Sequence, residues 1–306
     1  MTNALNSGAN DPTQRLTGVN SGGVLIILPV LNEVDNITEL LDGIHRELAD
    51  IPYTVCIIDD GSKDGTVEEI QAAMAVDGHH LYLIQRQKKF RGSQRGSALK
   101  TGLEWGLQHT EHGIFVEIDG DLSHRPEELK TGIRLVEEEG YNVAIASKYV
   151  PGSQVINRPL GRRLVSLLSS TAVGMVITRQ IKDWSNGYRF YDRATAQLLT
   201  QHKLRYGSPI YLTEVLSIWL RRGVRVVEFP TLYVGRNEGL SKLRLIDLGK
   251  AGLAVFEIGL RYHISGFAQK AEHPGGYPVL ADAGDTSTLA LPESKKSLKS
   301  GTANLG

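Results

Sequence analysis

The feature that most constrains the fold is an alternation of short apolar segments with stretches of helical periodicity. The segment VLIILPV at 24–30 is continuously apolar and ends at turn residues, which is typical of a strand buried on both faces of a sheet. Apolar residues then recur at helical spacing from Ile37 to Leu48. The alternation continues in strand-like segments at 53–59, 81–84, 113–119 and 142–147, and in helix-like segments at 97–108 and 126–139. This order predicts an α/β, Rossmann-like fold with a mostly parallel central sheet flanked by helices.

The second half of the chain is less regular. Its pattern predicts a helix over 162–176, an amphipathic helix over 212–220 and a strand over 224–229. We treat these elements as an extension of the same domain, which we bound at residues 23–267.

The two ends of the chain have a different composition. Residues 1–22 lack the continuous apolar segment of a signal peptide, and we predict a flexible lead-in. Residues 268–306 are rich in Pro, Gly, Ser, Thr and Lys and show no sustained period, which predicts a disordered tail.

Charge and cysteine content exclude several classes of protein. The chain has 34 basic and 34 acidic side chains, so it lacks the overall charge excess that would indicate a nucleic-acid partner. Cys56 is the only cysteine, so no internal disulfide forms, and a cytosolic compartment fits best. Its setting in YTVCIID predicts a core position on a strand.

No stretch reaches the roughly 18 to 20 consecutive apolar residues that cross a bilayer. The nearest approach is 164–177, which is followed by Arg179. It is preceded by Arg158, Arg162 and Arg163, cations that suit anionic headgroups and a lipid phosphate. We interpret it as a core helix or as an interfacial one, with the core favoured, and the stretch at 248–267 offers the same two alternatives.

Acidic residues follow three of the predicted strands. They lie at or just beyond the strand ends: Glu33 at the first, Asp59 and Asp60 at the second, and Asp119 and Asp121 at the fourth. Ligands of open parallel sheets bind outside the carboxyl ends of the strands, so these acids are expected to converge on one edge.

The triplet Asp119-Gly120-Asp121 offers hard oxygen ligands suited to Mg²⁺ or Mn²⁺. A plain turn is the alternative, and the position after a strand favours the metal. Asp60 is placed to accept hydrogen bonds from a ribose or base. For Asp64 a role in capping a helix is favoured.

Six motifs, in order, resemble those of the family 2 glycosyltransferases, and most closely the branch that transfers mannose to dolichol or polyprenol phosphate. They are PVLNE, DDGSKDGT, DGDLSHRPEEL, SKYVPGS, SNGYRFY and RNEGLSKL, and the resemblance covers most of the chain, from about Val24 to Lys242. The resemblance implies a GT-A fold, a GDP-mannose donor, a divalent metal, and transfer with inversion to a lipid phosphate.

The resemblance also implies roles for particular residues. Asp119 and Asp121 would bind the metal, and Asp121, Arg189 and Arg236 would be catalytic. Arg189 would lie with Trp184 and Asn186 in the acceptor pocket. A loop that closes over phosphates would contain Arg236, Ser241 and Lys242. The chemistry agrees, because two cations beside a glycine hinge suit the binding of an anion. The implied donor contacts are Pro29, Leu31, Glu33, Ile58, Asp60, Asp119, Gly120, Asp121, Ser123, Lys148, Arg236 and Lys242.

The sequence departs from the family pattern at several positions. Leu31 stands where members often have Tyr, and Lys148 replaces an Arg, which removes a bidentate phosphate grip. Gly120 and Ser123 fall at variable positions of the metal motif, and Glu214 replaces a Gln.

The basic run at 85–100 contains six cations and no acid. A loop at the donor or acceptor edge is favoured over a solvated face, and a nucleic-acid surface is disfavoured because the run lacks aromatic platforms.

A phosphate acceptor is already ionised at neutral pH, so the predicted reaction needs no strong general base. For a sugar hydroxyl acceptor, Asp121 or Glu214 would be the candidates. The alternatives are a glucose-type transferase that uses a UDP-sugar, with a lipid phosphate or a glycan as acceptor, and a non-catalytic nucleotide-sugar binding subunit. The expected location is the cytoplasmic face of a membrane, through peripheral contact or a small anchoring subunit.

Overall fold

The computed structural model describes residues 22–76, 80–86, 95–206, 210–235 and 245–264. Most of the predicted lead-in and all of the predicted tail therefore lie outside the described residues. A seven-stranded sheet forms the centre, in the order β3-β2-β1-β4-β7-β5-β8, and β6 pairs with β9 in a small second sheet. Within the large sheet only β7 runs antiparallel to its neighbours, β4 and β5. The predicted mostly parallel sheet is thus confirmed.

The strands are β1 (Val24–Val30), β2 (Tyr53–Asp59), β3 (Leu81–Gln85), β4 (Ile114–Glu117), β5 (Val143–Ser147), β6 (Gln154–Ile156), β7 (Arg189–Asp192), β8 (Val226–Pro230) and β9 (Leu232–Val234). The helices are α1 (Val34–Glu47), α2 (Thr66–Val76), α3 (Arg95–His109), the 3₁₀ turn η1 (Pro126–Glu128), α4 (Leu129–Glu137), α5 (Leu160–Val176), α6 (Arg193–Thr200), α7 (Ile210–Arg221) and α8 (Leu245–Ile264).

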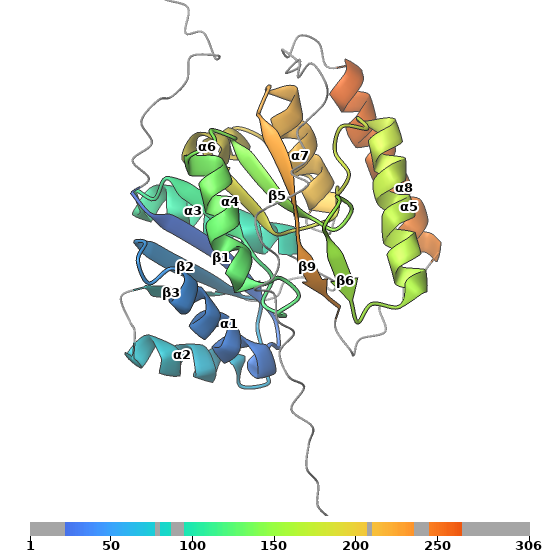
Figure 1. Cartoon of the computed structure of the whole chain (residues 1–306). Helices are drawn as coiled ribbons and strands as arrows, with labels where there is room; N and C mark the ends of the chain where they lie inside the picture. Colours follow the sequence, from blue (N-terminus) through green and yellow to red (C-terminus); the bar gives the residue numbers. More distant parts are fainter. Residues whose placement is uncertain (1–21, 77–79, 87–94, 207–209, 236–244, 265–306) are drawn as a thin grey trace, which may run out of the picture.

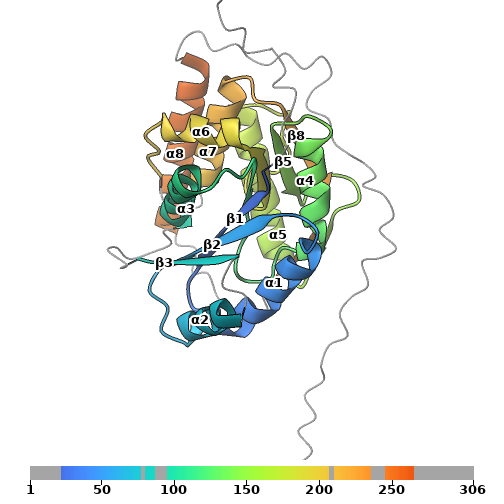
Figure 2. The same cartoon turned by 90° about the vertical axis from the view of Figure 1, so that its left-hand side faces the viewer.

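Helices cover both faces of the sheet (Figures 1 and 2). Along β1, Leu25 and Ile27 pack on the side of α3, α6 and α7, whereas Val24, Ile26 and Leu28 pack on the side of α1 and α4. Alternate residues point to opposite faces of a strand, so a strand covered on both faces must be apolar throughout. This explains the continuous apolar sequence of β1.

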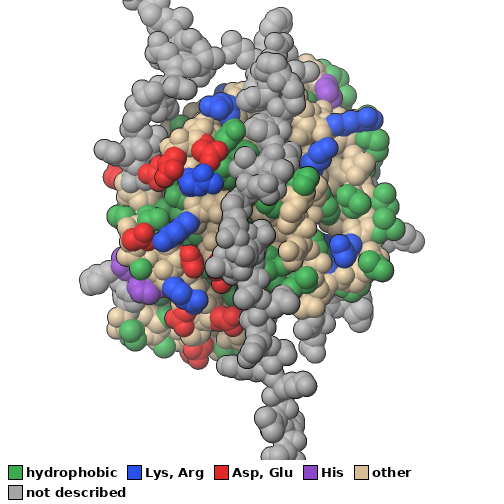
Figure 3. Space-filling model, in the orientation of Figure 1, with side chains coloured by type: hydrophobic (Ala, Val, Ile, Leu, Met, Phe, Trp, Pro, Cys, Tyr) green, Lys and Arg blue, Asp and Glu red, His purple; other side chains and the backbone are tan. Residues whose placement is uncertain are grey.

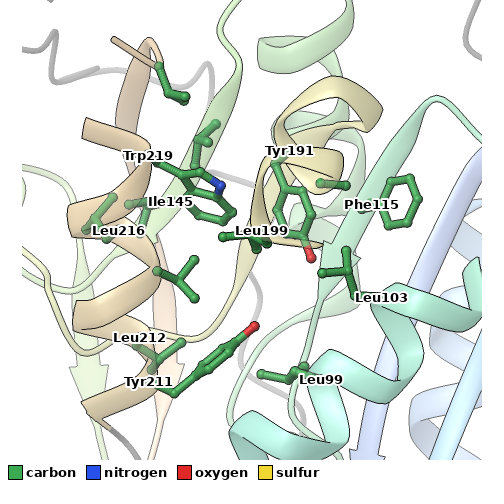
Figure 4. Packing of buried hydrophobic residues seen from close by; sticks show 14 of the residues in the cluster. Leu99, Leu103, Phe115, Ile145, Tyr191, Leu199, Tyr211, Leu212, Leu216 and Trp219 are labelled. Carbon is green, nitrogen blue, oxygen red and sulfur yellow. The ribbon is translucent and has the colours of Figure 1, made fainter. Parts of the chain in front are cut away.

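The core on the α7 side contains polar aromatic residues as well as aliphatic ones. Figure 4 shows Tyr191, Tyr211 and Trp219 among the leucines, with the two tyrosine hydroxyls directed into the same region. All three side chains are almost fully buried. Buried hydroxyls require partners, and theirs is a carboxylate at the end of β4, described below.

Helices α5 and α8 lie side by side at one edge of the molecule (Figure 1). They pack closely, because a Cβ at Gly259 would lie 2.3 Å from Cγ1 of Val176. Much of their apolar surface is exposed, so the favoured prediction of a core helix at 164–177 is wrong. The exposed apolar residues are Leu160, Leu164, Val165, Leu167, Leu168 and Met175 of α5, and Leu253, Phe256, Leu260 and Ile264 of α8.

Periodicity indicated that α5 is a helix with an apolar face. Whether another element packs against that face depends on the tertiary fold, which the periodicity of one segment does not show. Among the helices that the structure describes, none has both the length and the apolar character needed to span a membrane.

Candidate active site

The turns after β1 and β2 interlock at the carboxyl edge of the sheet. Asn32, with a positive φ of 55°, donates its backbone N–H to Oγ of Ser62 at 2.9 Å and accepts from the backbone N–H of Lys63 at 2.9 Å. Asp64 accepts from the backbone N–H of Val34 at 3.2 Å and of Thr66 at 3.1 Å. Asp64 therefore holds the two turns together at the start of α2, in agreement with the structural role favoured for it.

Asp59 ends β2 and Asp60 follows it, and the two acids have separate partners. Asp59 accepts from the backbone N–H groups of Gly61 and Ser62, which shapes the turn. Asp60 pairs with the guanidinium of Arg86, whose Nε and Nη2 lie 2.8 and 2.6 Å from Oδ1. Charge-assisted pairs of this kind fix the orientation of both groups. Arg86 thus orients the acid that was predicted to contact the nucleoside.

The metal motif lies directly against the end of β1. A Cβ at Gly120 would lie 3.1 Å from Cγ1 of Val30 and 3.4 Å from Cγ of Glu33, so only a small residue fits there without a shift. The structure therefore brings together Pro29, Glu33 and Gly120, three of the predicted donor contacts. Glu33 is 8% exposed, and its carboxylate accepts from Nδ2 of Asn36 at 2.9 Å.

Asp119 and Asp121 follow β4 with different contacts. Oδ1 of Asp119 lies 2.6 Å from Nε of Arg95, and Oδ2 lies 3.4 Å from Nε2 of the buried His124. Oδ1 of Asp121 accepts from the backbone N–H of Ser123 at 3.1 Å. Neighbouring groups thus orient both acids, which lie at the edge of the sheet and are separated in sequence only by Gly120.

Leu31 and Ile58 occupy different environments. The side chain of Leu31 is 36% exposed at the turn after β1, where a ligand can reach it. Ile58 is fully buried in the core against α3. The structure therefore does not support a side-chain contact between Ile58 and a donor.

A second polar cluster surrounds Lys148, just after β5. Its Nζ lies 3.2 Å from Oδ2 of Asp183 and 5.1 Å from the ring centre of Tyr233, while Cζ of Arg158 lies 5.4 Å from the same ring. Burial lowers the pKa of Lys148, and the charges of Asp183 and, more weakly, of Asp119 oppose this shift. The cluster adjoins α5, because the hydroxyl of Tyr149 donates to Oγ of Ser166 at 2.6 Å.

Arg189 is a structural residue in this conformation. It is fully buried and donates to the backbone oxygens of Asn186 at 3.0 Å and Leu212 at 2.9 Å. Trp184 and Asn186 are also buried. The predicted contact between Arg189 and an acceptor phosphate is therefore not supported, because the donors of the guanidinium point to backbone carbonyls within the core.

Arg189 is opposite Glu117 in the register of β7 and β4. Oε1 of Glu117 accepts from the hydroxyls of Tyr191 at 3.1 Å and Tyr211 at 3.4 Å, which explains the inward hydroxyls in Figure 4. Burial raises the pKa of Glu117, and the charges of Arg189 and Arg95 act against that shift.

Glu214 has a structural position as well. Its carboxylate accepts from the backbone N–H groups of Arg205 at 2.9 Å and Tyr206 at 3.1 Å. Nη1 of Arg261, on α8, lies 3.8 Å from it. Glu214 therefore ties α7 to α8 and is occupied in a way that does not suit the general base suggested for a hydroxyl acceptor.

The donor set near Asp119 fits a hard divalent cation. Within the described ranges, no group of three or more His, Cys, Asp or Glu side chains could enclose a metal ion. Two carboxylates suffice for Mg²⁺ or Mn²⁺ in a nucleotide complex, because such ions keep water ligands and take further oxygens from phosphates. The residues present therefore fit a metal that binds together with a nucleotide, better than a permanently enclosed ion.

Some predicted residues lie outside the described residues, and some contacts were not predicted. The predicted residues outside the described ranges are Arg236, Ser241, Lys242 and the middle of the basic run. The contacts of Arg86, Arg95, His124 and Tyr233 were not predicted, whereas Arg158 was predicted as a cation for a lipid phosphate and lies over the ring of Tyr233. The cations of the basic run were the only signal for Arg86 and Arg95, and their acidic partners are distant in sequence.

A mostly parallel sheet whose carboxyl edge bears acids is the arrangement of nucleotide-binding α/β enzymes. Within that class the family is defined by sequence: residues 25–202 match the family described as glycosyl transferase family 2. The chain belongs to this family and is a glycosyltransferase, so the resemblance noted in the sequence is confirmed.

Two curated relatives resemble most of the chain. Polyprenol monophosphomannose synthase of Mycolicibacterium smegmatis is 30% identical over 252 residues, which cover 82% of this chain and 89% of the relative. Undecaprenyl-phosphate mannosyltransferase of Micrococcus luteus is 28% identical over 78% of this chain and 94% of its own length.

Solved structures show the fold. Glucosyl-3-phosphoglycerate synthase of Mycobacterium tuberculosis, in complex with Mn²⁺, UDP-glucose and phosphoglyceric acid, has a TM-score of 0.56 at 20% identity and covers 78% of this chain and 79% of that chain. The same enzyme with phosphoglyceric acid alone has a TM-score of 0.55 at 20% identity, over 85% and 88% of the two chains. The predicted GT-A fold is confirmed by this similarity.

Proposed function

We propose that this protein transfers mannose from GDP-mannose to a polyprenyl phosphate, with inversion at the anomeric carbon. The observation that carries the proposal is the position of the Lys148 cluster between the acids after β4 and the exposed apolar helix α5. A lipid phosphate requires both cations and an apolar surface, and these lie next to the acids proposed to bind the donor. The two curated relatives, named for polyprenol and undecaprenyl-phosphate substrates, support this acceptor.

The donor would bind at the carboxyl edge of β1, β2 and β4. Glu33 and Asp60 would contact the nucleoside, with Asp60 oriented by Arg86. Asp119 and Asp121 would hold a Mg²⁺ or Mn²⁺ ion, which when bound neutralises the charge of the diphosphate. Mannose is favoured because the two curated relatives described above are named for it.

The reaction is a single displacement. An oxygen of the acceptor phosphate attacks the anomeric carbon, a new C–O bond forms, and the bond to the diphosphate breaks, so that the nucleoside diphosphate leaves. The acceptor oxygen is already ionised, so no proton has to be removed. This agrees with the structural positions of Glu117 and Glu214, neither of which is presented to the site as a base.

The face formed by α5 and α8 is proposed to meet the cytoplasmic surface of a membrane, directly or with a small anchoring subunit. Figure 3 shows green and blue side chains over α5 at the right-hand edge, whereas red side chains gather on the left-hand part of the view. Arg163 and Arg179 are exposed near the two ends of α5. Cations beside an apolar face suit anionic headgroups.

The first test is donor choice. The full chain is incubated with Mg²⁺ or Mn²⁺, a short polyprenyl phosphate and GDP-mannose, UDP-glucose or UDP-N-acetylglucosamine, and the lipid product is identified by mass spectrometry. We expect transfer from GDP-mannose that is lost in Asp121→Asn and kept in Asp42→Asn, an exposed acid of α1.

Three other outcomes are informative. Transfer only from a UDP-sugar would replace mannose by a glucose-type sugar and leave the reaction class intact. Nucleotide binding without turnover would contradict catalysis by this chain alone and indicate a binding subunit. Activity that persists in Asp121→Asn would remove this acid from the proposed metal site.

A further inference from the structure

Arg95 has a place in the site that donor and acceptor binding, as proposed above, do not explain. It is the first residue of α3, and its Nε lies 2.6 Å from Oδ1 of Asp119. Its Nη2 donates to the backbone oxygen of Gly187 at 3.4 Å. The side chains of Arg95 and Asp119 are 20% and 27% exposed, so the pair lies at the margin of the site, where a ligand can reach both.

The backbone around Arg95 leaves room for this guanidinium. A Cβ at Gly187 would lie 2.0 Å from Nη2 and 2.3 Å from Nη1 of Arg95. A Cβ at Gly96 would lie 2.7 Å from Cβ of Tyr211, so Gly96 allows the first turn of α3 to approach α7. Two glycines from separate parts of the sequence thus determine where Arg95 lies.

The charge of Arg95 is unusual for its position in a helix. The amino end of a helix is partially positive, so a cation in the first turn is disfavoured unless an acid compensates it. Asp119 is that acid, and its other oxygen lies 3.4 Å from Nε2 of His124. A divalent cation that binds Asp119 must therefore compete with Arg95 for Oδ1.

We propose that Arg95 exchanges partners when the donor binds: its guanidinium leaves Asp119 to the divalent cation and binds the diphosphate of the donor. This inference rests on the proposed function, because it requires a metal and a nucleoside diphosphate. A guanidinium is repelled by a neighbouring divalent cation and binds phosphate oxygens in a bidentate manner. The metal and the diphosphate would then bind cooperatively, with Arg95 as the coupling group.

The test is a pair of binding titrations on the full chain. Calorimetry measures Mn²⁺ alone, and then GDP and UDP with and without Mn²⁺, for the wild type, Arg95→Met and Arg134→Met. Arg134 of α4 is the matched control, because it forms an exposed ion pair with Glu139, just beyond the end of that helix. In Arg95→Met we expect Mn²⁺ alone to bind about three- to tenfold more tightly, and the diphosphate in the presence of Mn²⁺ to bind about tenfold more weakly. The control variant Arg134→Met should change neither the affinity for Mn²⁺ nor the affinity for the diphosphate.

A second variant displaces Arg95 without removing its charge. Gly187→Ala places a methyl group where the guanidinium lies, and because this is the far end of a flexible side chain, the fold should be retained. We expect Gly187→Ala to increase the affinity for Mn²⁺ as Arg95→Met does, and to add nothing in the Arg95→Met background. If Arg95→Met does not fold, as judged by circular dichroism, Gly187→Ala provides the same test.

Two results would overturn the inference. One is an affinity for Mn²⁺ alone that is unchanged or lower in both folded variants, and the other is diphosphate binding that does not weaken. Failure of the wild type to bind either nucleotide with Mn²⁺ would contradict the proposed function and the diphosphate half of the exchange. The Mn²⁺ titration would still decide whether Arg95 and the cation compete for Asp119.

Discussion

Glu128 is a buried carboxyl group whose ionisation should make the stability of the protein depend on pH. It ends η1 and is 7% exposed. Its two oxygens accept from Oγ1 of Thr231 and from the backbone N–H of Leu232, each at 2.7 Å. These bonds tie η1 to the connection between β8 and β9. Burial nevertheless dominates and raises the pKa of Glu128 to about 7.

The size and sign of the effect follow from this pKa. The difference between about 7 and the ordinary 4.5 corresponds to about 3 kcal/mol of unfolding free energy. Well below pH 4.5 the carboxyl of Glu128 is protonated in the folded and the unfolded protein, and the free energy of unfolding includes this contribution in full. As the pH rises towards about 7, the unfolded state releases its proton first, so the contribution is lost.

The substitution Glu128→Gln isolates this group, because glutamine keeps the shape and can accept from Leu232 while donating to Thr231. Urea unfolding of both proteins from pH 5 to pH 8 gives the free energies of unfolding. We expect the wild type to lose about 2.5 kcal/mol relative to the variant over this range, because part of the loss has already occurred at pH 5. Parallel curves for the two proteins would refute the reasoning, since titration of the remaining groups is common to both.

Three further predictions concern other parts of the chain. Cys56 is buried and its pKa is raised to about 12, so a thiol reagent at pH 8 should label it only after unfolding; labelling at the same rate in the native protein would contradict this. Arg86→Met should weaken nucleotide binding about tenfold in a fluorescence titration, because it frees the acid after β2 from its orienting pair; unchanged affinity would exclude that role. Leu164→Glu combined with Leu168→Glu should abolish sedimentation with anionic vesicles, whereas Val76→Glu, at a more exposed apolar residue on α2, should not; equal sedimentation of all three proteins would remove α5 from the membrane contact.

The sequence patterns predicted elements whose character is local. β1 is apolar throughout, and β2 and β5 are largely apolar, because both faces of the sheet are covered, and this is visible in each segment by itself. β7 was not predicted, because its four residues include a buried arginine, and its antiparallel place between β4 and β5 depends on pairing with distant strands. The exposure of α5 could not be predicted either, because it depends on which elements cover an apolar face.

The site was predictable to a similar extent. The acids after β1, β2 and β4 were found because parallel strands bring their carboxyl ends to one edge. Their cationic partners were missed: Arg86 and Arg95 come from a run that gives no indication of which acid each one meets. Arg189 was placed at the acceptor by motif, whereas burial shows that it supports the backbone.

The central claim is that the acceptor is a lipid phosphate, and extraction of the product tests it most directly. The full chain is incubated with radiolabelled GDP-mannose, Mg²⁺ and vesicles that contain a polyprenyl phosphate, and the label is partitioned between water and organic solvent. The account predicts label in the organic phase that requires the phosphate on the lipid and disappears in Asp121→Asn. Label that enters only a water-soluble glycan, or that reaches a polyprenol without phosphate equally well, would contradict it.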